Sequence, residues 1–233
     1  MRAAAVRILD APPWPAPLTR EWAWGGADGA GASVALVDSG VDATHPLVRG
    51  VTRAVVVCAG EAGAEVTEDG APDASGHGTA CASVIRRFAP DCALHGVRVL
   101  GADATGTADA LLTGLAWAIE QRFDVINLSM SSRKRDAAPL LHDLADAAYF
   151  HRTMLVCSAH NAAVESYPWR FASVISVGAH ETEDPYEFLA NPRPPVEFFA
   201  RGTDVEVGWL DGSTITGTGN SFATAHLSGL CAQ

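Results

Sequence analysis

The chain has 233 residues, of which 48% are hydrophobic and 18% charged, and its 27 acidic and 16 basic residues give a formal net charge of −11. This composition is typical of a globular protein and excludes a disordered or fibrous one. The acidic excess argues against a nucleic-acid-binding surface, and the one basic run, Arg133-Lys134-Arg135, is interpreted as a solvated loop.

The predicted elements alternate between short apolar runs and amphipathic stretches. Residues 1–30, rich in Pro, Gly and Trp, are expected to form an irregular arm of a single domain that spans residues 1–233. In chain order, strands are predicted at residues 32–37, 94–99, 125–128, 153–159 and 174–179, and helices at residues 107–121, 139–151 and 221–230. This alternation predicts an α/β protein, a three-layer αβα sandwich with a mostly parallel central sheet.

The cysteines and the N-terminus bear on the compartment. The five cysteines include no C-x-x-C pair, which favours scattered free thiols in a reducing environment. Arg7 and the prolines that follow it interrupt the N-terminal apolar stretch, and no window approaches the roughly 18 apolar residues of a membrane span. We therefore expect a cytoplasmic protein that does not associate with membranes.

Three residues with potentially catalytic side chains lie beyond the carboxyl ends of the predicted strands, where a parallel sheet of this kind binds its ligands. Asp38 directly follows the first predicted strand, His77 stands between Gly76 and Gly78, and Ser221 opens the last predicted helix. Each alone is also explained as a turn or capping residue. Together, in the order Asp, His, Ser, they match one of the known orders of a catalytic triad.

The motifs around these residues resemble those of the subtilisin-like serine proteases, the subtilases, over about residues 32–229. Residues 38–42 with His45-Pro46, residues 76–79 and residues 219–224 are similar to the three catalytic motifs, although Asn220, Phe222 and Ala225 stand where Thr, Met and Pro are usual. Residues 124–129 resemble the strand that walls the substrate pocket, and residues 158–161 the oxyanion segment. The resemblance implies a triad of Asp38, His77 and Ser221, with Asn161 in the oxyanion hole.

The resemblance also implies that an extended peptide substrate binds beside residues 128–131. The substrate-binding residues it indicates are Leu128, Ser129, Met130, Ser131, Ser158, Ala159, His160 and Ser166. Ser131, His160 and Ser166 stand where the family usually has glycine, so we expect a narrowed, more polar pocket and restricted specificity. The alternative is that shifts of the backbone absorb these side chains.

Other departures from the family concern metal and maturation. Leu47 follows His45-Pro46 where the family's tight calcium site usually has Asp, and Leu offers no oxygen ligand, so no metal and no cofactor are expected. The sequence shows no upstream pro-region, which favours an intracellular processing protease, for example for a leader peptide, or a chain assisted by a partner chain. The alternative, favoured by the pocket substitutions and the short C-terminus, is a catalytically quiet subtilase-like module that binds peptides or a partner.

Overall fold

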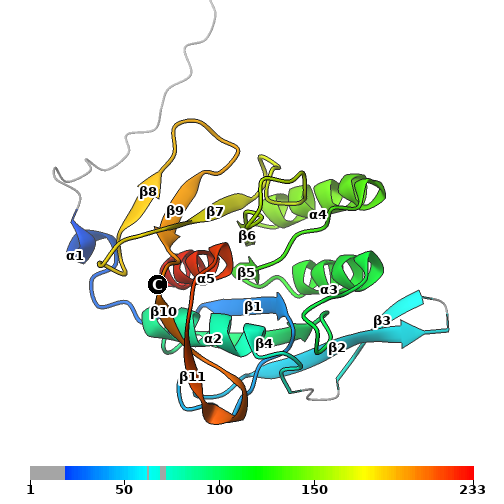
Figure 1. Ribbon diagram of the computed structural model, residues 1–233, viewed down its shortest axis with the longest axis horizontal. Helices are drawn as coiled ribbons and strands as arrows, with labels where there is room; N and C mark the ends of the chain where they lie inside the picture. Colours follow the sequence, from blue (N-terminus) through cyan, green and yellow to red (C-terminus); the bar gives the residue numbers. More distant parts are fainter. Residues whose placement is uncertain (1–18, 62, 69–71) are drawn as a thin grey trace, which may run out of the picture.

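The computed structural model describes residues 19–61, 63–68 and 72–233 and is built on a nine-stranded sheet (Figure 1). The strands lie in the order β3-β2-β4-β1-β5-β6-β7-β9-β8, and all neighbours are parallel except the two edge strands, β3 and β8. The strands of this sheet are β1 (Ser33–Asp38), β2 (Arg53–Gly60), β3 (Gly63–Thr67), β4 (Ala93–Arg98), β5 (Val125–Leu128), β6 (Met154–Ser158), β7 (Ile175–His180), β8 (Phe188–Ala190) and β9 (Phe198–Arg201). A separate antiparallel pair is formed by β10 (Val205–Gly208) and β11 (Thr214–Gly217).

Helices cover both faces of the sheet, which confirms the predicted three-layer architecture. The helices are α1 (Arg20–Ala23), α2 (His77–Phe88), α3 (Ala108–Glu120), α4 (Ala138–Phe150) and α5 (Asn220–Cys231), with short 3-10 turns at Arg135–Ala137 and Leu210–Gly212. Helices α2 and α5 pack in one hydrophobic cluster, and α3 and α4 pack in the other on the opposite face.

The central strand β1 shows why the sheet forms as it does. Val34 and Leu36 belong to the cluster under α2 and α5, whereas Ala35 and Val37 belong to the cluster under α3 and α4. Because successive side chains of a strand point to opposite faces, a strand covered on both sides must be apolar at every position. Burying each Val or Leu contributes about 1.5–3 kcal/mol, an upper estimate, so this apolar run holds the layers together.

The predicted strands are the central strands of the sheet, and the strands that were not predicted lie toward its edges or in the separate pair. All five predicted strands and all three predicted helices are present, and each of their boundaries lies within one residue of the predicted one. The strands β2, β3 and β8 to β11 were not predicted. Within the predicted irregular arm, α1 occupies Arg20–Ala23, and residues 1–18 lie outside the described part of the chain. Among the described residues, no helix has the length and apolar character to cross a membrane.

Candidate active site

A buried carboxylate and an imidazole form the centre of the site. Asp38 ends β1 and is fully buried, and His77 is the first residue of α2. His77 Nδ1–H donates to Asp38 Oδ1 at 2.8 Å, and Asp38 Oδ1 also accepts the backbone N–H of Ser39 at 2.8 Å. The negative charge of Asp38 raises the pKa of His77 above its ordinary value, although burial of the ring opposes this. The bond to Nδ1 leaves the Nε2 lone pair free to accept a proton.

A second buried carboxylate, Asp73, organises the start of α2. Its Oδ1 accepts from Ser39 Oγ (2.7 Å) and from the backbone N–H groups of Ser75 (3.0 Å) and Gly76 (2.9 Å). Its Oδ2 accepts from the Thr79 N–H (2.7 Å) and the Thr79 hydroxyl (2.6 Å). Gly76, the residue before α2, has no side chain that could cap the helix, so Asp73 satisfies these donors instead. Sequence analysis missed Asp73, although an Asp shortly before a helix is a known start signal.

Ser221 lies at the N-terminal end of α5, as predicted. Its hydroxyl donates to the carbonyl oxygen of Ser129 at 3.3 Å, and no hydrogen bond joins it to His77 among the described residues. Its backbone N–H has no partner in the described part of the chain, as is usual in the first turn of a helix. The structure therefore brings the three side chains of the predicted triad to one edge of the sheet, with the serine hydroxyl aimed at Ser129.

The Cys81 thiol lies close to both His77 and Ser221. Its Sγ is 3.6 Å from Ser129 Oγ and 4.0 Å from the carbonyl oxygen of Ser221. Asp38, His77 and Cys81 place ligand atoms within 4.8 Å of one another, the one such group of metal-ligating residues in the described part of the chain. Burial raises the pKa of the Cys81 thiol well above its ordinary value, whereas a metal binds the thiolate. The absence of a metal stays a prediction.

Asn161 sits beside the N-terminus of α5 with its amide group partly free. Its Oδ1 accepts the backbone N–H of Asn220 at 3.0 Å, and its Nδ2 has no hydrogen-bond partner among the described residues. Asn220 also ties α5 to the sheet, because its side chain accepts from the Ala179 N–H (2.7 Å) and donates to the Ala159 carbonyl (3.0 Å). The Asn161 amide and the Ser221 N–H are thus two free donors at the same edge of the sheet.

A pocket of about 180 Å³ joins Ser221 to most of the predicted substrate-binding residues. Its lining is Ser129, Met130, Ser131, Ser158, Ala159, His160, Asn161 and Ser221. Two predicted residues do not line it: the side chain of Leu128 lies in the core under α3 and α4, and Ser166 is fully buried. Ser166 Oγ accepts from Ser131 Oγ at 3.1 Å and from Trp169 Nε1 at 2.9 Å, so it supports the pocket wall from behind.

Together, these features define a hydrolase-type site with a serine that an imidazole could activate. A model of the Subtilase family matches residues 29–233. The minor extracellular protease Epr of Bacillus subtilis (strain 168) is 28% identical over 229 residues, covering 93% of this chain and 34% of that protein, so the chain spans about a third of this relative. An intracellular serine protease of Paenibacillus polymyxa is 29% identical over 231 residues, covering 90% of this chain and 68% of that one.

The similarity to solved structures supports the match to the Subtilase family. The crystal structure of a cold adapted subtilisin-like serine proteinase matches with a TM-score of 0.72 and 27% identity, covering 93% of this chain and 79% of that one. The chain belongs to the subtilase family, peptidase family S8, whose members are serine endopeptidases.

The first prediction concerns Asp73. In the unaltered chain the donors around this residue bond to a carboxylate, whereas in an Asp73→Asn variant they face an amide N–H₂ or a neutral oxygen. We expect this change to lower the free energy of unfolding by about 2 kcal/mol and Tm by roughly 4–8 °C. Because the charge of Asp73 also raises the pKa of His77, the His77 titration measured by NMR should move to lower pH. The control is Asp143→Asn on the exposed face of α4; equal effects of the two variants would contradict the assignment.

The second prediction concerns pH. The pKa of His77 is raised above 6.5, so the pairing of its protonated ring with Asp38 increases the free energy of unfolding below pH 6.5. This contribution is lost as the pH rises through the folded-state pKa. Asp38→Asn should remove this dependence and return the NMR titration of the ring toward or below pH 6.5, because the effect of burial then outweighs the smaller effect of Asp73. Urea unfolding at several pH values measures the first effect. A His77 titration that stays raised in the variant would exclude Asp38 as the cause.

Proposed function

We propose that this chain is a serine endopeptidase in which Asp38, His77 and Ser221 act as the catalytic triad. The observation that carries this proposal is the hydrogen bond of 2.8 Å between His77 Nδ1 and the buried Asp38. The carboxylate holds one tautomer of the ring and stabilises the imidazolium that forms when the ring accepts the proton of Ser221. Ser221 Oγ then attacks the peptide carbonyl carbon, and the leaving amine takes the proton from His77.

The oxyanion that forms on the carbonyl oxygen needs donors at a fixed position. The Asn161 Nδ2 group and the Ser221 N–H have no hydrogen-bond partner in the described part of the chain, and both residues line the same pocket. Both sit at the N-terminus of α5, where the helix dipole also favours negative charge. Water then hydrolyses the acyl-enzyme, with His77 acting as base in the second half of the reaction.

One observation favours the alternative, a catalytically quiet module that binds peptides. The Ser221 hydroxyl is bonded to the Ser129 carbonyl and not to His77. Activity therefore requires the hydroxyl to rotate toward the ring, and hydrogen bonds of catalytic groups are often formed only when substrate is bound. The intact set of Asp38, His77, Asn161 and Ser221 favours the enzyme.

Labelling with a fluorophosphonate tests the two functions. We expect the full chain to be labelled at Ser221, because only a serine activated by a neighbouring base reacts at neutral pH. Ser221→Ala should abolish labelling, and His77→Ala should reduce it strongly, whereas Ser213→Ala, an exposed serine on the β10–β11 side, should leave it unchanged. Peptide binding by a chain that the reagent does not label would support the quiet module instead.

For substrate selection, we propose restricted specificity, suited to processing a defined precursor inside a cell. The pocket of about 180 Å³ that contains Ser221 carries the side chains of Ser131 and His160 in its walls. The similarity to an intracellular serine protease supports the cellular location. A leader peptide is one such precursor, and a partner chain that assists the enzyme belongs to the same proposal.

Enlarging the pocket tests this restriction. In a Ser131→Gly/His160→Gly variant, cleavage after Phe should rise at least about tenfold in kcat/KM relative to the unaltered chain, because removing steric exclusion is worth about 10–200-fold. A peptide library analysed by mass spectrometry measures the preference. Broad acceptance of large apolar residues by the unaltered chain would show that the backbone absorbs the added side chains.

A further inference from the structure

The walls of the pocket beside Ser221 offer hydrogen-bond donors and no carboxylate. Ser131 and His160 line it, and no Asp or Glu is among its lining residues. His160 Nδ1 accepts the backbone N–H of Ala162 at 3.0 Å, so in the neutral ring the proton resides on Nε2, which is a donor. His160 Nε2–H is therefore suited to donate to a ligand atom that carries lone pairs.

Ser131, Ser166 and Trp169 are joined by hydrogen bonds in which one donor proton lacks an acceptor among the described residues. Trp169 Nε1 and Ser131 Oγ both donate to Ser166 Oγ, at 2.9 Å and 3.1 Å. Three donors, one indole N–H and two hydroxyls, thus share two hydrogen bonds, and the described residues provide no acceptor for the third proton. If Ser166 donates to Ser131 instead, the Ser131 hydroxyl is free to donate into the pocket. A carboxylate placed there would satisfy the unpaired donor.

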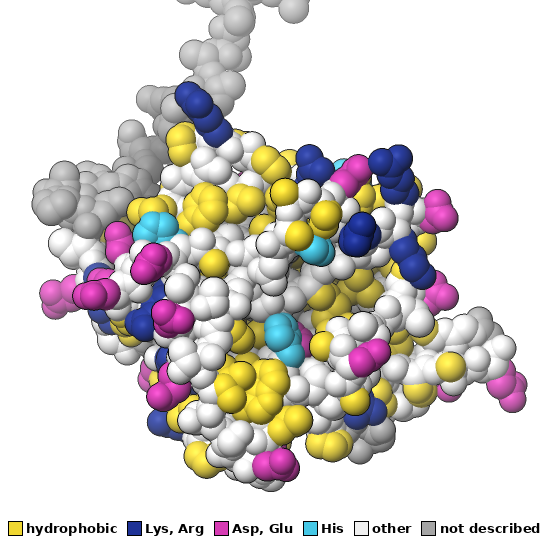
Figure 2. Space-filling model, viewed as in Figure 1, with side chains coloured by type: hydrophobic (Ala, Val, Ile, Leu, Met, Phe, Trp, Pro, Cys, Tyr) yellow, Lys and Arg dark blue, Asp and Glu magenta, His cyan; other side chains and the backbone are white. Residues whose placement is uncertain are grey.

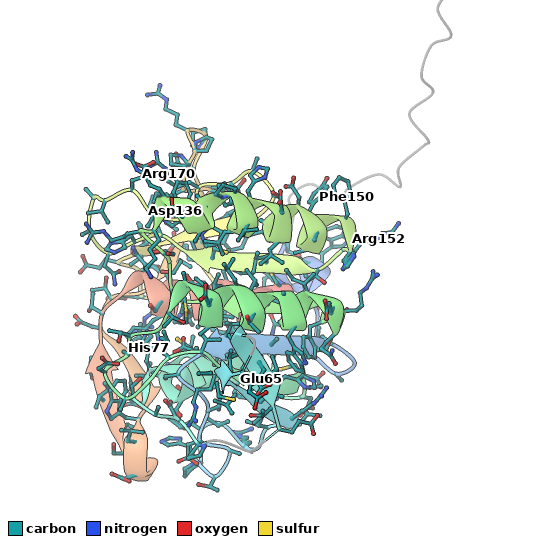
Figure 3. All side chains as sticks on the ribbon, turned by 90° about the vertical axis from the view of Figure 1, so that its right-hand side faces the viewer. Glu65, His77, Asp136, Phe150, Arg152 and Arg170 are labelled. Carbon is teal, nitrogen blue, oxygen red and sulfur yellow. The ribbon has the colours of Figure 1, made fainter. Side chains whose placement is uncertain are left out.

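Cationic side chains surround the outer end of the same walls. Ser132 pairs with Tyr167 through backbone hydrogen bonds of 2.8 Å and 2.9 Å, so the segments that hold Ser131 and Ser166 continue side by side. Beyond them lies a cavity of about 330 Å³ lined by Arg133, Arg135, Val164 and Glu165. Figure 2 shows Lys and Arg side chains gathered in the upper right of this face, and Figure 3 places Arg170 at the same end of the molecule as His77.

The cations in this region exceed the carboxylates. The basic residues are Arg133, Lys134, Arg135 and Arg170, and the acidic residues of the same segments are Asp136 and Glu165. Glu165 is already occupied, because it accepts from Arg135 at 3.0 Å and from the Tyr167 hydroxyl. Arg133, Lys134 and Arg170 form no ion pair within the described part of the chain. In a chain of net charge −11, this is a local excess of positive charge in the segments next to the pocket residues Ser131 and Asn161.

We propose that the peptidase selects substrates with an acidic residue, Glu or Asp, immediately before the cleaved bond. This proposal rests on the proposed function, because Ser221 and Asn161 line the same pocket and would hold the carbonyl group of that residue. The side-chain carboxylate accepts from Ser131 and His160, and Arg133 and Lys134, which follow the pocket wall in the chain, attract it by their charge. An apolar side chain would offer no acceptor to His160 Nε2 or to the one spare hydroxyl proton of the Ser131–Ser166 pair, which favours the acid over Phe or Leu.

The test compares internally quenched peptides that differ only at this residue, with Glu, Gln, Phe or Lys in a common alanine-rich flank. We expect kcat/KM of the full chain to be at least about tenfold higher for Glu than for Gln, and the ratio to fall as salt increases from 50 to 500 mM, because the Debye length shortens from roughly 14 Å to about 4 Å. Equal rates for Glu and Gln, or faster cleavage after Phe or Lys, would overturn the proposal.

Charge-reversed variants show whether the basic segment is responsible. Arg133→Glu/Lys134→Glu should abolish the preference for Glu over Gln, and Ser131→Ala should reduce it severalfold. The control is Arg152→Glu, since Arg152 is exposed at the opposite end of the molecule from His77 (Figure 3); this variant should keep the preference. A preference that survives the double variant would overturn the role of the two cations.

Binding by a Ser221→Ala variant separates this proposal from the proposed function. Fluorescence anisotropy with labelled Glu and Gln peptides measures the pocket without any chemistry, and we expect at least about tenfold tighter binding of Glu at 50 mM salt. Equal affinities overturn the acidic preference even if a fluorophosphonate labels the unaltered chain, in which case the peptidase proposal stands. Tight, selective binding by a chain that the reagent does not label supports the pocket preference and contradicts the peptidase.

Discussion

The close approach of two backbone segments is the constraint on which the site depends. A Cβ atom at Gly78, the second residue of α2, would lie 1.9 Å from the carbonyl oxygen of Gly40, just after β1. Gly40 itself has a φ of +102°, and a Cβ there would lie 2.8 Å from the carbonyl oxygen of Pro72. Because no side chain separates these segments, the helix starts directly against the end of β1. The distance of 2.8 Å between His77 and Asp38 is therefore set by backbone packing and not by flexible side chains.

The same approach concentrates two buried carboxylates at the start of one helix, an arrangement that requires compensation. Asp38 and Asp73 are both at least nine-tenths buried, and buried charges are tolerated only with several hydrogen bonds or a partner. Ser39 bridges them, because its N–H donates to Asp38 and its hydroxyl donates to Asp73. Asp73 is satisfied by backbone and hydroxyl donors alone, whereas Asp38 has the ring of His77 as its partner. Asp73 therefore fixes the start of α2, and Asp38 holds and polarises the imidazole of His77.

The fold could be predicted from sequence where the chain is buried on both faces. β1 and β6 contain continuous apolar runs because each strand lies between two helix layers, and in β5 only the buried, hydrogen-bonded Asn127 interrupts the run. The edge strand β8 is exposed at all three positions, and β3 is only partly covered, so neither has a pattern that distinguishes it from a loop. The hairpin of β10 and β11 depends on pairing between Val207 and Ile215 across a turn, and such pairings are fixed by tertiary structure more than by local pattern.

Site residues could be predicted from the sequence where they end a strand or begin a helix. They could not be predicted where their role depends on contacts with residues distant in the sequence. Asp38, His77 and Ser221 occupy such positions, but Asp73 acquires its partners only when its loop folds over Ser39 and Thr79. The run Arg133-Lys134-Arg135 was interpreted as a solvated loop, and its side chains are indeed exposed. What the sequence could not show is that Ser132, directly before this run, pairs through its backbone with Tyr167, so that the run starts beside the segment of Ser166. Under the proposed preference, the local charge beside the pocket, and not the net charge of the whole chain, determines which substrate side chains are attracted to it, because charges at close range are screened least.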